Sequence, residues 1–259
     1  METFSIMTCG DSRYFYFLKN FEKNIYERYG FFPFIYDLGL TTEQKKELKS
    51  PLRKITVPSI FNQKNSNNHI KAVHKPLCIR DCLSYSSKDV LYLDADTISI
   101  SPFHPEDFKG CDVAITPRHP KERKPSYYIN GLLNSGVLFF RNNDSVLNFI
   151  TLWDHFCQES DTTDQKALSD ILALHIDILG EKGAYKWNNL NILLLDPEIY
   201  NDVSCRIGKV FHFKNAGRTE KAYQRYRRMA KCQALFPHFL EKIISFNRHS
   251  RLFTWRKKN

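Results

Sequence analysis

Long apolar runs are missing from this sequence. No window of about 18 consecutive apolar residues occurs, so we expect no membrane-spanning helix. The first residues, METFSIMTCGDSRYF, lack the basic start and the apolar stretch of a secretory signal. The 7 cysteines are scattered and form no CxxC pair, which argues against a disulfide framework and a thiolate zinc site. These absences predict a cytoplasmic protein with reduced thiols, free in solution or peripheral at a membrane.

Glycine and proline are also scarce. The chain contains 10 glycines and 11 prolines with no regular period, which excludes collagen-like and low-complexity classes. Of its 259 residues, 42% are hydrophobic and 25% are charged, as in an ordinary globular protein. We therefore expect one core of medium size and no disordered linker.

Basic charge is concentrated at the end of the chain. The net charge is +10, yet residues 206–259 contain 15 Lys and Arg against 2 Asp and Glu, and the part before them is close to neutral. Overall basicity is therefore no sign that the body binds nucleic acid. We predict a body at 1–217 and a basic helical C-terminal extension at 218–259.

Short apolar runs alternate with amphipathic stretches, which predicts an α/β fold with helices flanking a mostly parallel sheet. Strands are expected at 4–7, 33–37, 53–57, 90–93, 112–116, 136–140, 191–195 and 209–213. Helices are expected at 14–29, 41–48, 69–85, 145–157, 164–175 and after 217, and a polar loop at 62–68.

Two carboxylates follow the most apolar of these strands. Asp94 and Asp96 come directly after the run at 90–93. Ligands of open parallel sheets bind at the carboxyl ends of strands, and paired oxygen ligands suit Mg or Mn carrying a diphosphate. An Asp-x-Asp tripeptide alone is common and is often a solvated loop, so the information lies in the buried strand before it.

The segment from Tyr92 to Thr97, YLDADT, resembles the metal-binding segment of GT-A fold glycosyltransferases, especially the retaining glycogenin and lipopolysaccharide galactosyltransferase type. Other segments follow in the order which that family requires. They are Lys75-Pro76 with Arg80, the strand beginning Asn134-Ser135-Gly136, Thr163-Asp164-Gln165, and the late segment His212 to Gly217.

The resemblance implies a GT-A, Rossmann-like fold and a set of site residues. It implies Mn2+ or Mg2+ held by Asp94, Asp96 and His212, with Asp164 and Gln165 at the reacting face of the sugar. Contacts to the nucleotide-sugar donor are expected at Thr8, Cys9, Tyr14, Lys75, Arg80, Asp94, Ala95, Asp96, Asn134, Ser135, Gly136, Lys214, Gly217 and Arg218.

Several of these residues also have a purely structural interpretation. Asp164 could cap its helix, Gly136 could merely pack, and Tyr14 could belong to the core instead of stacking on a uracil. The late segment lacks the Gly-x-x-Lys-Pro-Trp ending of the family. The cation that holds the phosphate is therefore open among Lys214, Arg218 and Lys221.

The resemblance implies a metal-dependent transfer of a hexose from a UDP-sugar to an acceptor hydroxyl, with retention, in glycan or glycolipid synthesis. The acceptor would be a glycan, a glycolipid or a protein. One alternative is a nucleotidyltransferase, although 8–13 lacks the Gly-rich loop of that class. Another is a sugar-nucleotide-binding or interaction protein on a transferase scaffold.

The basic end contains aromatic residues between its cations, among them Phe246, Phe253 and Trp255. This composition suits an anionic membrane surface, and a solvated extension or an oligomer contact is the structural alternative. A nucleic-acid role is not expected, because no recognised motif is present. The sequence does not indicate an oligomeric state.

Overall fold

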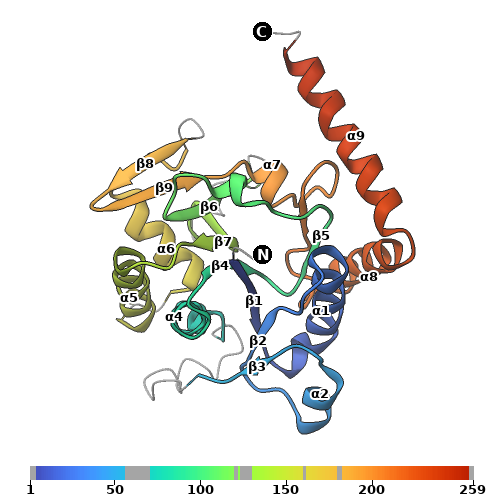
Figure 1. Ribbon diagram of the computed structural model, residues 1–259, viewed down its shortest axis with the longest axis horizontal. Coiled ribbons are helices and arrows are strands. Elements are labelled where there is room, and N and C mark those ends of the chain that lie inside the picture. Colours follow the sequence, from blue (N-terminus) through green and yellow to red (C-terminus); the bar gives the residue numbers. More distant parts are fainter. Residues whose placement is uncertain are drawn as a thin grey trace.

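A sheet of eight strands runs through the middle of the computed structural model (Figure 1). The structure describes residues 4–55, 71–119, 122, 130–159, 162–179 and 183–256, with backbone alone at 71–72 and 251–256. The expected loop at 62–68 and the end of the expected strand at 53–57 lie outside these residues. The strand order is β3-β2-β1-β4-β7-β6-β9-β8.

The strands are β1 (Phe4–Gly10), β2 (Phe34–Asp37), β3 (Leu52–Arg53), β4 (Asp89–Leu93), β6 (Val113–Pro117), β7 (Leu133–Phe140), β8 (Ala184–Trp187) and β9 (Leu190–Leu194). The pairs β1–β2, β1–β4, β2–β3 and β6–β9 are parallel. β7 is antiparallel to both of its neighbours, and β8 and β9 form an antiparallel pair. The mixed α/β sheet confirms the predicted fold class.

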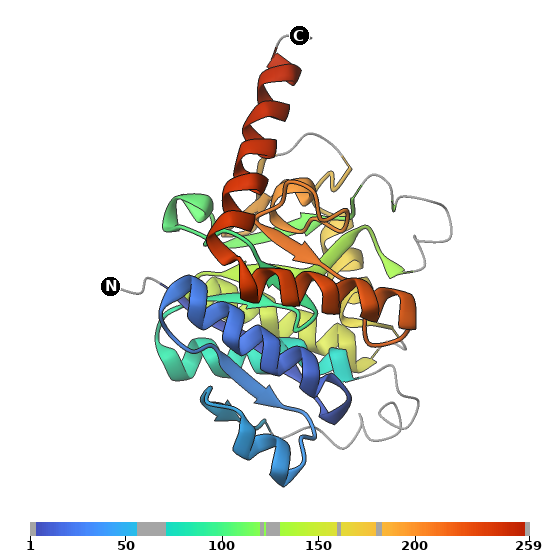
Figure 2. The ribbon, with the colours of Figure 1, turned by 90° about the vertical axis from the view of Figure 1, so that its right-hand side faces the viewer.

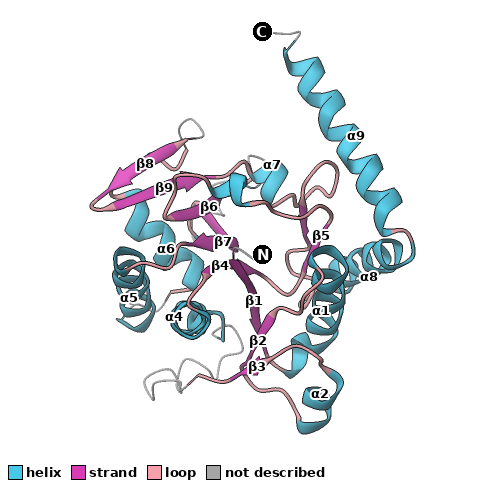
Figure 3. Cartoon of the chain, viewed as in Figure 1, coloured by secondary structure: helices cyan, strands magenta, loops and turns pink. Residues whose placement is uncertain are grey.

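Helices cover both faces of the sheet (Figures 1 and 3). One face carries α4 (Lys75–Ser86), α5 (Asp144–Glu159) and α6 (Asp164–Ala173), and the other carries α1 (Phe15–Tyr29). Alternate residues of one strand enter different cores. Tyr92 packs on the first face and Leu91 on the second, and both are buried. A strand covered on both faces is apolar throughout, which explains the unbroken run at 90–93.

The ends of α1 follow from its sequence. Phe17, Leu18, Phe21 and Ile25 are spaced for one helical face and are all buried. Gly30 ends the helix in the left-handed conformation, with φ of 78°, and its N–H donates to the carbonyl of Tyr26. The short helix α2 (Thr42–Glu47) begins with a capping box between Thr41 and Gln44.

A second sheet of two short strands lies beside the first. β5 (Thr97–Ser99) pairs antiparallel with β10 (Val210–His212), and His212 lies opposite Thr97. The sequence predicted β10 but missed β5, since three residues directly after a turn carry too little pattern. It also missed β8 and the short helix α7 (Pro197–Tyr200), together with the 3-10 turns η1 (Ser12–Tyr14), η2 (Lys71–His74) and η3 (Pro105–Phe108).

β7 is regular against one neighbour and irregular against the other. Toward β4 its pairing is continuous through Val137. Toward β6, Ile115 pairs with Leu138 while Thr116 pairs with Asn134, so the register shifts between them. A bulge of this kind redirects side chains and is common beside functional sites. Here the residues of β7 left between the two pairs are Ser135, Gly136 and Val137.

The basic C-terminal part forms two helices, α8 (Glu220–Leu235) and α9 (Pro237–Arg256). Tyr226 and Ala230 of α8 and Ile244 of α9 are buried in a core that they share with Phe17 of α1. Figure 2 shows α8 lying beside α1 and α9 leading away from the body. The predicted boundary at 217 therefore lies just before two helices, and residues of both share a core with the body.

Exposed apolar side chains form a stripe on α9. Phe236 just before the helix and Phe239, Ile243 and Phe246 within it are 57%, 66%, 40% and 73% exposed, and their spacing places them on one face. Within the described residues, no helix is both long enough and apolar enough to cross a bilayer.

Candidate active site

A tight turn places the two aspartates after β4. The N–H of Thr97 donates to the carbonyl of Asp94 at 3.0 Å, and the Thr97 hydroxyl donates to the same oxygen at 2.7 Å. The turn reverses the chain into β5, while the N–H of Asp94 donates to the carbonyl of Gly136 at 2.9 Å. Both carboxylates are therefore held at the carboxyl end of a buried strand.

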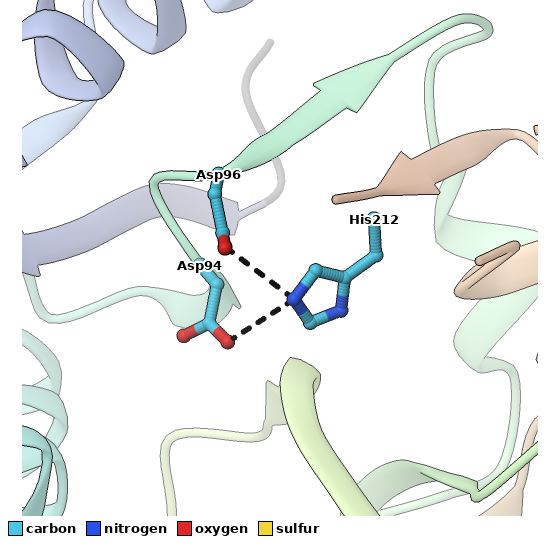
Figure 4. A group of neighbouring side chains, drawn as sticks. All are labelled: Asp94, Asp96 and His212. Carbon is cyan, nitrogen blue, oxygen red and sulfur yellow. Dashed lines mark ion pairs between the residues drawn. The ribbon is translucent and has the colours of Figure 1, made fainter. Parts of the chain in front are cut away.

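The pairing of β5 with β10 brings His212 to these carboxylates. Its Nε2 lies 3.4 Å from Asp96 Oδ1 and 3.7 Å from Asp94 Oδ2 (Figure 4). The N–H of Phe213 donates to the carbonyl of Asp96 at 3.0 Å, which continues the pairing past the strand end. One ligand atom from each of the three side chains lies within 4.8 Å of the others. The structure thus confirms that the three residues predicted as a metal site come together.

Gly136 lies directly against this group. A Cβ at this position would stand 2.4 Å from His212 Cε1 and 2.8 Å from Asp94 Oδ2. Both distances are below any normal contact between heavy atoms, so only glycine leaves room for the imidazole and the carboxylate. Gly136, predicted as a contact to the donor, is therefore packed directly against the side chains of two other site residues.

Lys75 is the buried cation of the site. It begins α4, and its ammonium donates to Asp94 Oδ1 at 3.1 Å and to the carbonyl and hydroxyl of Ser135 at 2.9 and 3.0 Å. It also pairs with Asp164 Oδ2 at 3.0 Å. Burial opposes its charge, but the carboxylates of Asp164 and Asp94 outweigh it and raise the pKa of Lys75 above its ordinary value. The lysine therefore stays charged.

Asp94 is the carboxylate shared between Lys75 and His212. Its Oδ1 accepts from Lys75 and from the hydroxyl of Tyr92 at 2.7 Å, which leaves Oδ2 toward the imidazole. Burial would raise the pKa of Asp94, but Lys75, His212 and Tyr92 together hold it below its ordinary value. The residue is therefore an anion with one oxygen available to a ligand.

Asp164 does not cap its helix. The N-cap of α6 is Thr163, whose hydroxyl accepts from the N–H of Lys166, while Asp164 is the first helical residue and is buried. Its Oδ2 accepts from the Ser135 hydroxyl at 2.7 Å and pairs with Lys75. The structural alternative of a cap is therefore excluded, because the carboxylate points toward the site.

Gln165 and Asn134 line the same edge. Gln165 Oε1 accepts from the N–H of Ser135 at 3.4 Å, and its amide donates to the carbonyl of Asn130 at 2.8 Å. Asn134 is buried, and its side-chain oxygen accepts from the N–H of Gly136 at 2.8 Å. Asn134 therefore stabilises the bulge of β7, and Gln165 makes a long hydrogen bond to the backbone of the same bulge.

The charges of the described site residues do not balance. Asp94, Asp96 and Asp164 are opposed by the Lys75 ammonium and by a neutral or charged imidazole. Two carboxylates and an imidazole nitrogen form a donor set that suits Mn2+ and also accepts Mg2+. The excess negative charge, the inward-facing Nε2 and the space that Gly136 leaves all fit a divalent cation here.

No family model matches the sequence, and no curated protein matches it. Among solved structures, one similar chain is the galactosyltransferase LgtC in complex with donor and acceptor sugar analogs. It has a TM-score of 0.55 and 16% identity over 88% of this chain and 95% of the other. Another is a glycosyltransferase involved in glycosylation of the major capsid of PBCV-1, with a TM-score of 0.53 and 14% identity over 88% and 100%. An active-site Gln-to-Glu mutant of LgtC matches with a TM-score of 0.50 and 15% identity over 88% and 95%.

The chain has the GT-A glycosyltransferase fold. In this fold Tyr14 lies beside the late segment. A Cβ on Gly217 would stand 3.0 Å from the Tyr14 hydroxyl, so this glycine makes room for the phenol. Burial, and next the charge of Asp96, raise the pKa of Tyr14 to about 12, so the phenol stays neutral near Asp96 and Arg218.

Other residues predicted to contact the donor lie at the margins of the Asp94, Asp96 and His212 group or away from it. Thr8 is fully buried in β1, so its side chain is not accessible to a ligand. Cys9 is half-buried, and its Sγ lies 3.5 Å from the Tyr92 hydroxyl. Ala95 is buried in the middle of the turn. Arg80 lies one turn and a half beyond Lys75 on α4, and its charge acts on Asp154 of α5.

The three cations that follow His212 in the sequence lie in different environments. The Lys214 ammonium donates to both carboxylate oxygens of Glu122, at 2.9 and 2.7 Å, and burial lowers its pKa despite that carboxylate. Arg218 is exposed near Tyr14. Lys221 is exposed in the first turn of α8 and lines a hollow along that helix. Which of them holds a phosphate stays a prediction.

The sequence missed four residues that contact the site: Tyr92, Thr116, Glu122 and Asn201. Tyr92 begins the segment that resembles the metal-binding segment, but the sequence assigned no role to its side chain. Asn201 gave no signal, because its partner His212 is brought to it by the fold. The Asn201 side-chain oxygen lies 2.8 Å from His212 Nδ1.

The close packing at Gly136 gives a stability prediction. The new methyl group in Gly136→Ala would push the side chains of His212 and Asp94 away from residue 136. We therefore expect the free energy of unfolding in urea to fall by about 1–3 kcal/mol. Gly183→Ala is the matched control, because no atom of the described residues beyond its chain neighbours lies within 4 Å of a Cβ there, and its effect should stay within about 0.5 kcal/mol. Equal stability of the two variants would contradict the packing described for Gly136.

Proposed function

We propose that this protein is a metal-dependent glycosyltransferase that moves a hexose from a UDP-sugar to an acceptor hydroxyl. The observation that carries this proposal is the group of Asp94, Asp96 and His212 at the carboxyl end of β4, next to the buried Lys75–Asp164 pair. The GT-A fold and the glycosyltransferases that share it support the same function. The fold alone would not be sufficient, because one fold hosts several functions.

Asp94, Asp96 and His212 would hold the Mn2+ or Mg2+. When bound, the ion supplies charge stabilisation to the departing diphosphate. The chain's own residues prepare the site for it. Lys75 keeps Asp94 ionised, and Tyr92 donates to the Asp94 oxygen that faces away from His212, so the remaining oxygen is the one available to the ion.

The donor would lie along the edge formed by β1, the turn after β4, and the late segment. Tyr14 is a neutral phenol beside Gly217, so its ring could stack on a base and its hydroxyl could donate a hydrogen bond. Arg218, exposed near Tyr14, and Lys214 are the cations available to the phosphates. The identity of the base as uracil rests on the resemblance of the late segment and of YLDADT.

Retaining members of the family that the sequence resembles place an amide or a carboxylate near the reacting face of the sugar, and the acceptor would attack that face with help from the leaving phosphate. Asp164 and Gln165 come from the first turn of α6 and flank Ser135 of the bulge. The Asp164 carboxylate is already neutralised by Lys75, which makes it a poor attacking group and a good orienting one. Gln165 offers a carbonyl and an amide at the rim, and LgtC has an active-site glutamine. We therefore place Gln165 at the sugar and Asp164 behind it.

The acceptor is proposed to be a glycan or glycolipid presented at an anionic membrane surface. The stripe of Phe236, Phe239, Ile243 and Phe246 is exposed on α9, and Lys242 of the same helix, with Arg227 and Lys231 of α8, adds positive charge. An apolar helix face flanked by cations suits the headgroup region of an anionic bilayer. The chain would then work as a peripheral membrane protein.

Donor turnover tests the proposed function. The purified chain is incubated with UDP- and GDP-sugars in Mn2+ or in chelator, and released nucleotide is measured. We expect one UDP-sugar to be hydrolysed only with the metal, and Asp96→Asn to lower the rate by about 100-fold or more. Asp170→Asn is the matched control, since this half-exposed carboxylate pairs with Lys166 and contacts none of the predicted site residues that the structure describes.

Two outcomes would contradict the proposal in different ways. Binding of a UDP-sugar without turnover, with or without an acceptor, would indicate a binding protein. Formation of a sugar nucleotide from a nucleoside triphosphate and a sugar phosphate would indicate a nucleotidyltransferase.

The roles of Asp164 and Gln165 predict a change in rate without a change in donor affinity. Asp164→Asn and Gln165→Ala should each lower kcat by about 100-fold with little effect on KM for the donor, because Gln165 would contact the reacting sugar and Asp164 would orient the residues beside it. Gln224→Ala, at a half-buried residue of α8 that contacts Glu220, is the control. Proton NMR of the first hexose released should show the anomer of the donor. Unchanged kcat in both variants would remove them from the mechanism, and the opposite anomer would exclude retention.

Membrane contact through the α9 stripe is tested by sedimentation with vesicles. The double variant Phe239→Ser, Phe246→Ser should lower partitioning to phosphatidylglycerol vesicles by about 100-fold or more, because burial of the two Phe side chains contributes roughly 1.5–3 kcal/mol each. Leu174→Ser, at a residue 78% exposed after α6, is the control. Point variants are preferable to truncation, since Ile244 is part of the core. Equal binding of wild type and double variant would end this idea.

A further inference from the structure

The second ring nitrogen of His212 is held by a buried amide. Nδ1 of His212 lies 2.8 Å from the side-chain oxygen of Asn201. Both residues are buried, with 5% and 2% of their surface exposed. Asn201 takes no part in the proposed sugar transfer as described above, and its only described side-chain contacts are to His212 and to Thr116.

The hydrogen bonds through Asn201 have a direction. The Thr116 hydroxyl lies 3.4 Å from the backbone carbonyl of Asn134, which can only accept, so the hydroxyl donates to it. Thr116 Oγ1 therefore receives the Asn201 amide N–H, at 2.9 Å. This turns the Asn201 carbonyl oxygen toward His212, and an oxygen with no hydrogen can only accept from Nδ1–H.

A hydrogen on Nδ1 determines the state of the other ring nitrogen, Nε2. A neutral imidazole carries one hydrogen, so a hydrogen on Nδ1 leaves Nε2 with a lone pair. Nε2 is the atom that lies 3.4 Å from Asp96 Oδ1. We infer that Asn201, oriented by Thr116, is a positioning residue that fixes the tautomer of His212 with Nε2 free to bind the cation. The inference rests on the proposed metal site.

The backbone around Asn201 is built to hold this amide in place. Asp202 follows it and pairs with β10, since its N–H donates to the carbonyl of Val210 and its carbonyl accepts from the N–H of His212. The carboxylate of Asp202 accepts from the backbone N–H groups of 204–208, which closes the loop before β10. Asn201 and His212 are thus joined through the main chain as well as through their side chains.

Three variants separate the tautomer effect from simple loss of packing. Asn201→Leu removes the acceptor with little change in volume, whereas Asn201→Asp keeps an oxygen for Nδ1–H. Asn24→Leu is the matched control, because Asn24 is another buried amide, with hydrogen bonds to Ser99 of β5 at 3.0 and 2.7 Å. It supports the same small sheet without contacting His212, so it should lose comparable stability but keep the tautomer.

The first measurement needs no metal. Nitrogen–proton correlation NMR of the 15N-histidine-labelled full chain, at mildly alkaline pH where an ordinary imidazole is neutral, reports which ring nitrogen carries the hydrogen. His212→Gln assigns the signal among the 9 histidines. We expect Nδ1–H in wild type, Asn201→Asp and Asn24→Leu, and a mixture of tautomers in Asn201→Leu. Nδ1–H retained in Asn201→Leu, or a mixed tautomer in wild type, would overturn the inference.

The second measurement is Mn2+ affinity, followed by the electron paramagnetic resonance of free Mn2+ on titration. Asn201→Leu should bind Mn2+ about 10- to 100-fold more weakly, while Asn201→Asp and Asn24→Leu remain within a few-fold of wild type. Equal losses in Asn201→Leu and Asn24→Leu would overturn the positioning role. A wild type that binds no Mn2+ would contradict the proposed metal site. The NMR measurement would still show whether Asn201 fixes the tautomer of His212.

Discussion

The site depends on the antiparallel pairing of two very short strands. β5 carries the turn with both aspartates at its start, and β10 ends in His212, which lies opposite Thr97. Because strand registers are defined to the residue, this pairing determines that the imidazole meets the carboxylates. Asp202 and Ser99 support it from either side, the first through β10 and the second through Asn24 of α1. The large sheet provides β4, but it does not by itself bring His212 to the two aspartates.

Electrostatics limit what this arrangement can do. Buried carboxylates are costly unless they are paired, and Lys75 pairs with Asp94 and Asp164 at once. Asp96 is left to face the imidazole. A divalent cation would remove the remaining imbalance, and the neutral hydrogen-bond path through Asn201 would allow His212 to join it without adding charge. Stability of the free protein and affinity for the ion are therefore coupled in the same few residues.

The two helices of the basic C-terminal part have different structural roles. Its first helix shares a core with α1 through Tyr226, so it belongs to the fold. Its second helix leaves the body and exposes an apolar stripe. The basic residues at the end of the chain therefore lie on two different helices. One packs on the body, and the other carries an apolar face that has no partner among the described residues.

The sequence by itself determined the α/β class and most of the longer elements, because buried parallel strands and helical stripes follow simple periodicities. Its motifs also pointed to Asp94, Asp96 and His212, which the structure brings together. It did not determine β5, the bulge of β7 or the partners Tyr92, Thr116 and Asn201. These depend on residues far apart in the chain, such as His212 and Asp96, whose contact no local pattern encodes. Only the tertiary structure decided which atom of His212 faces the carboxylates, since a hydrogen-bond path through three separate segments sets the ring's orientation.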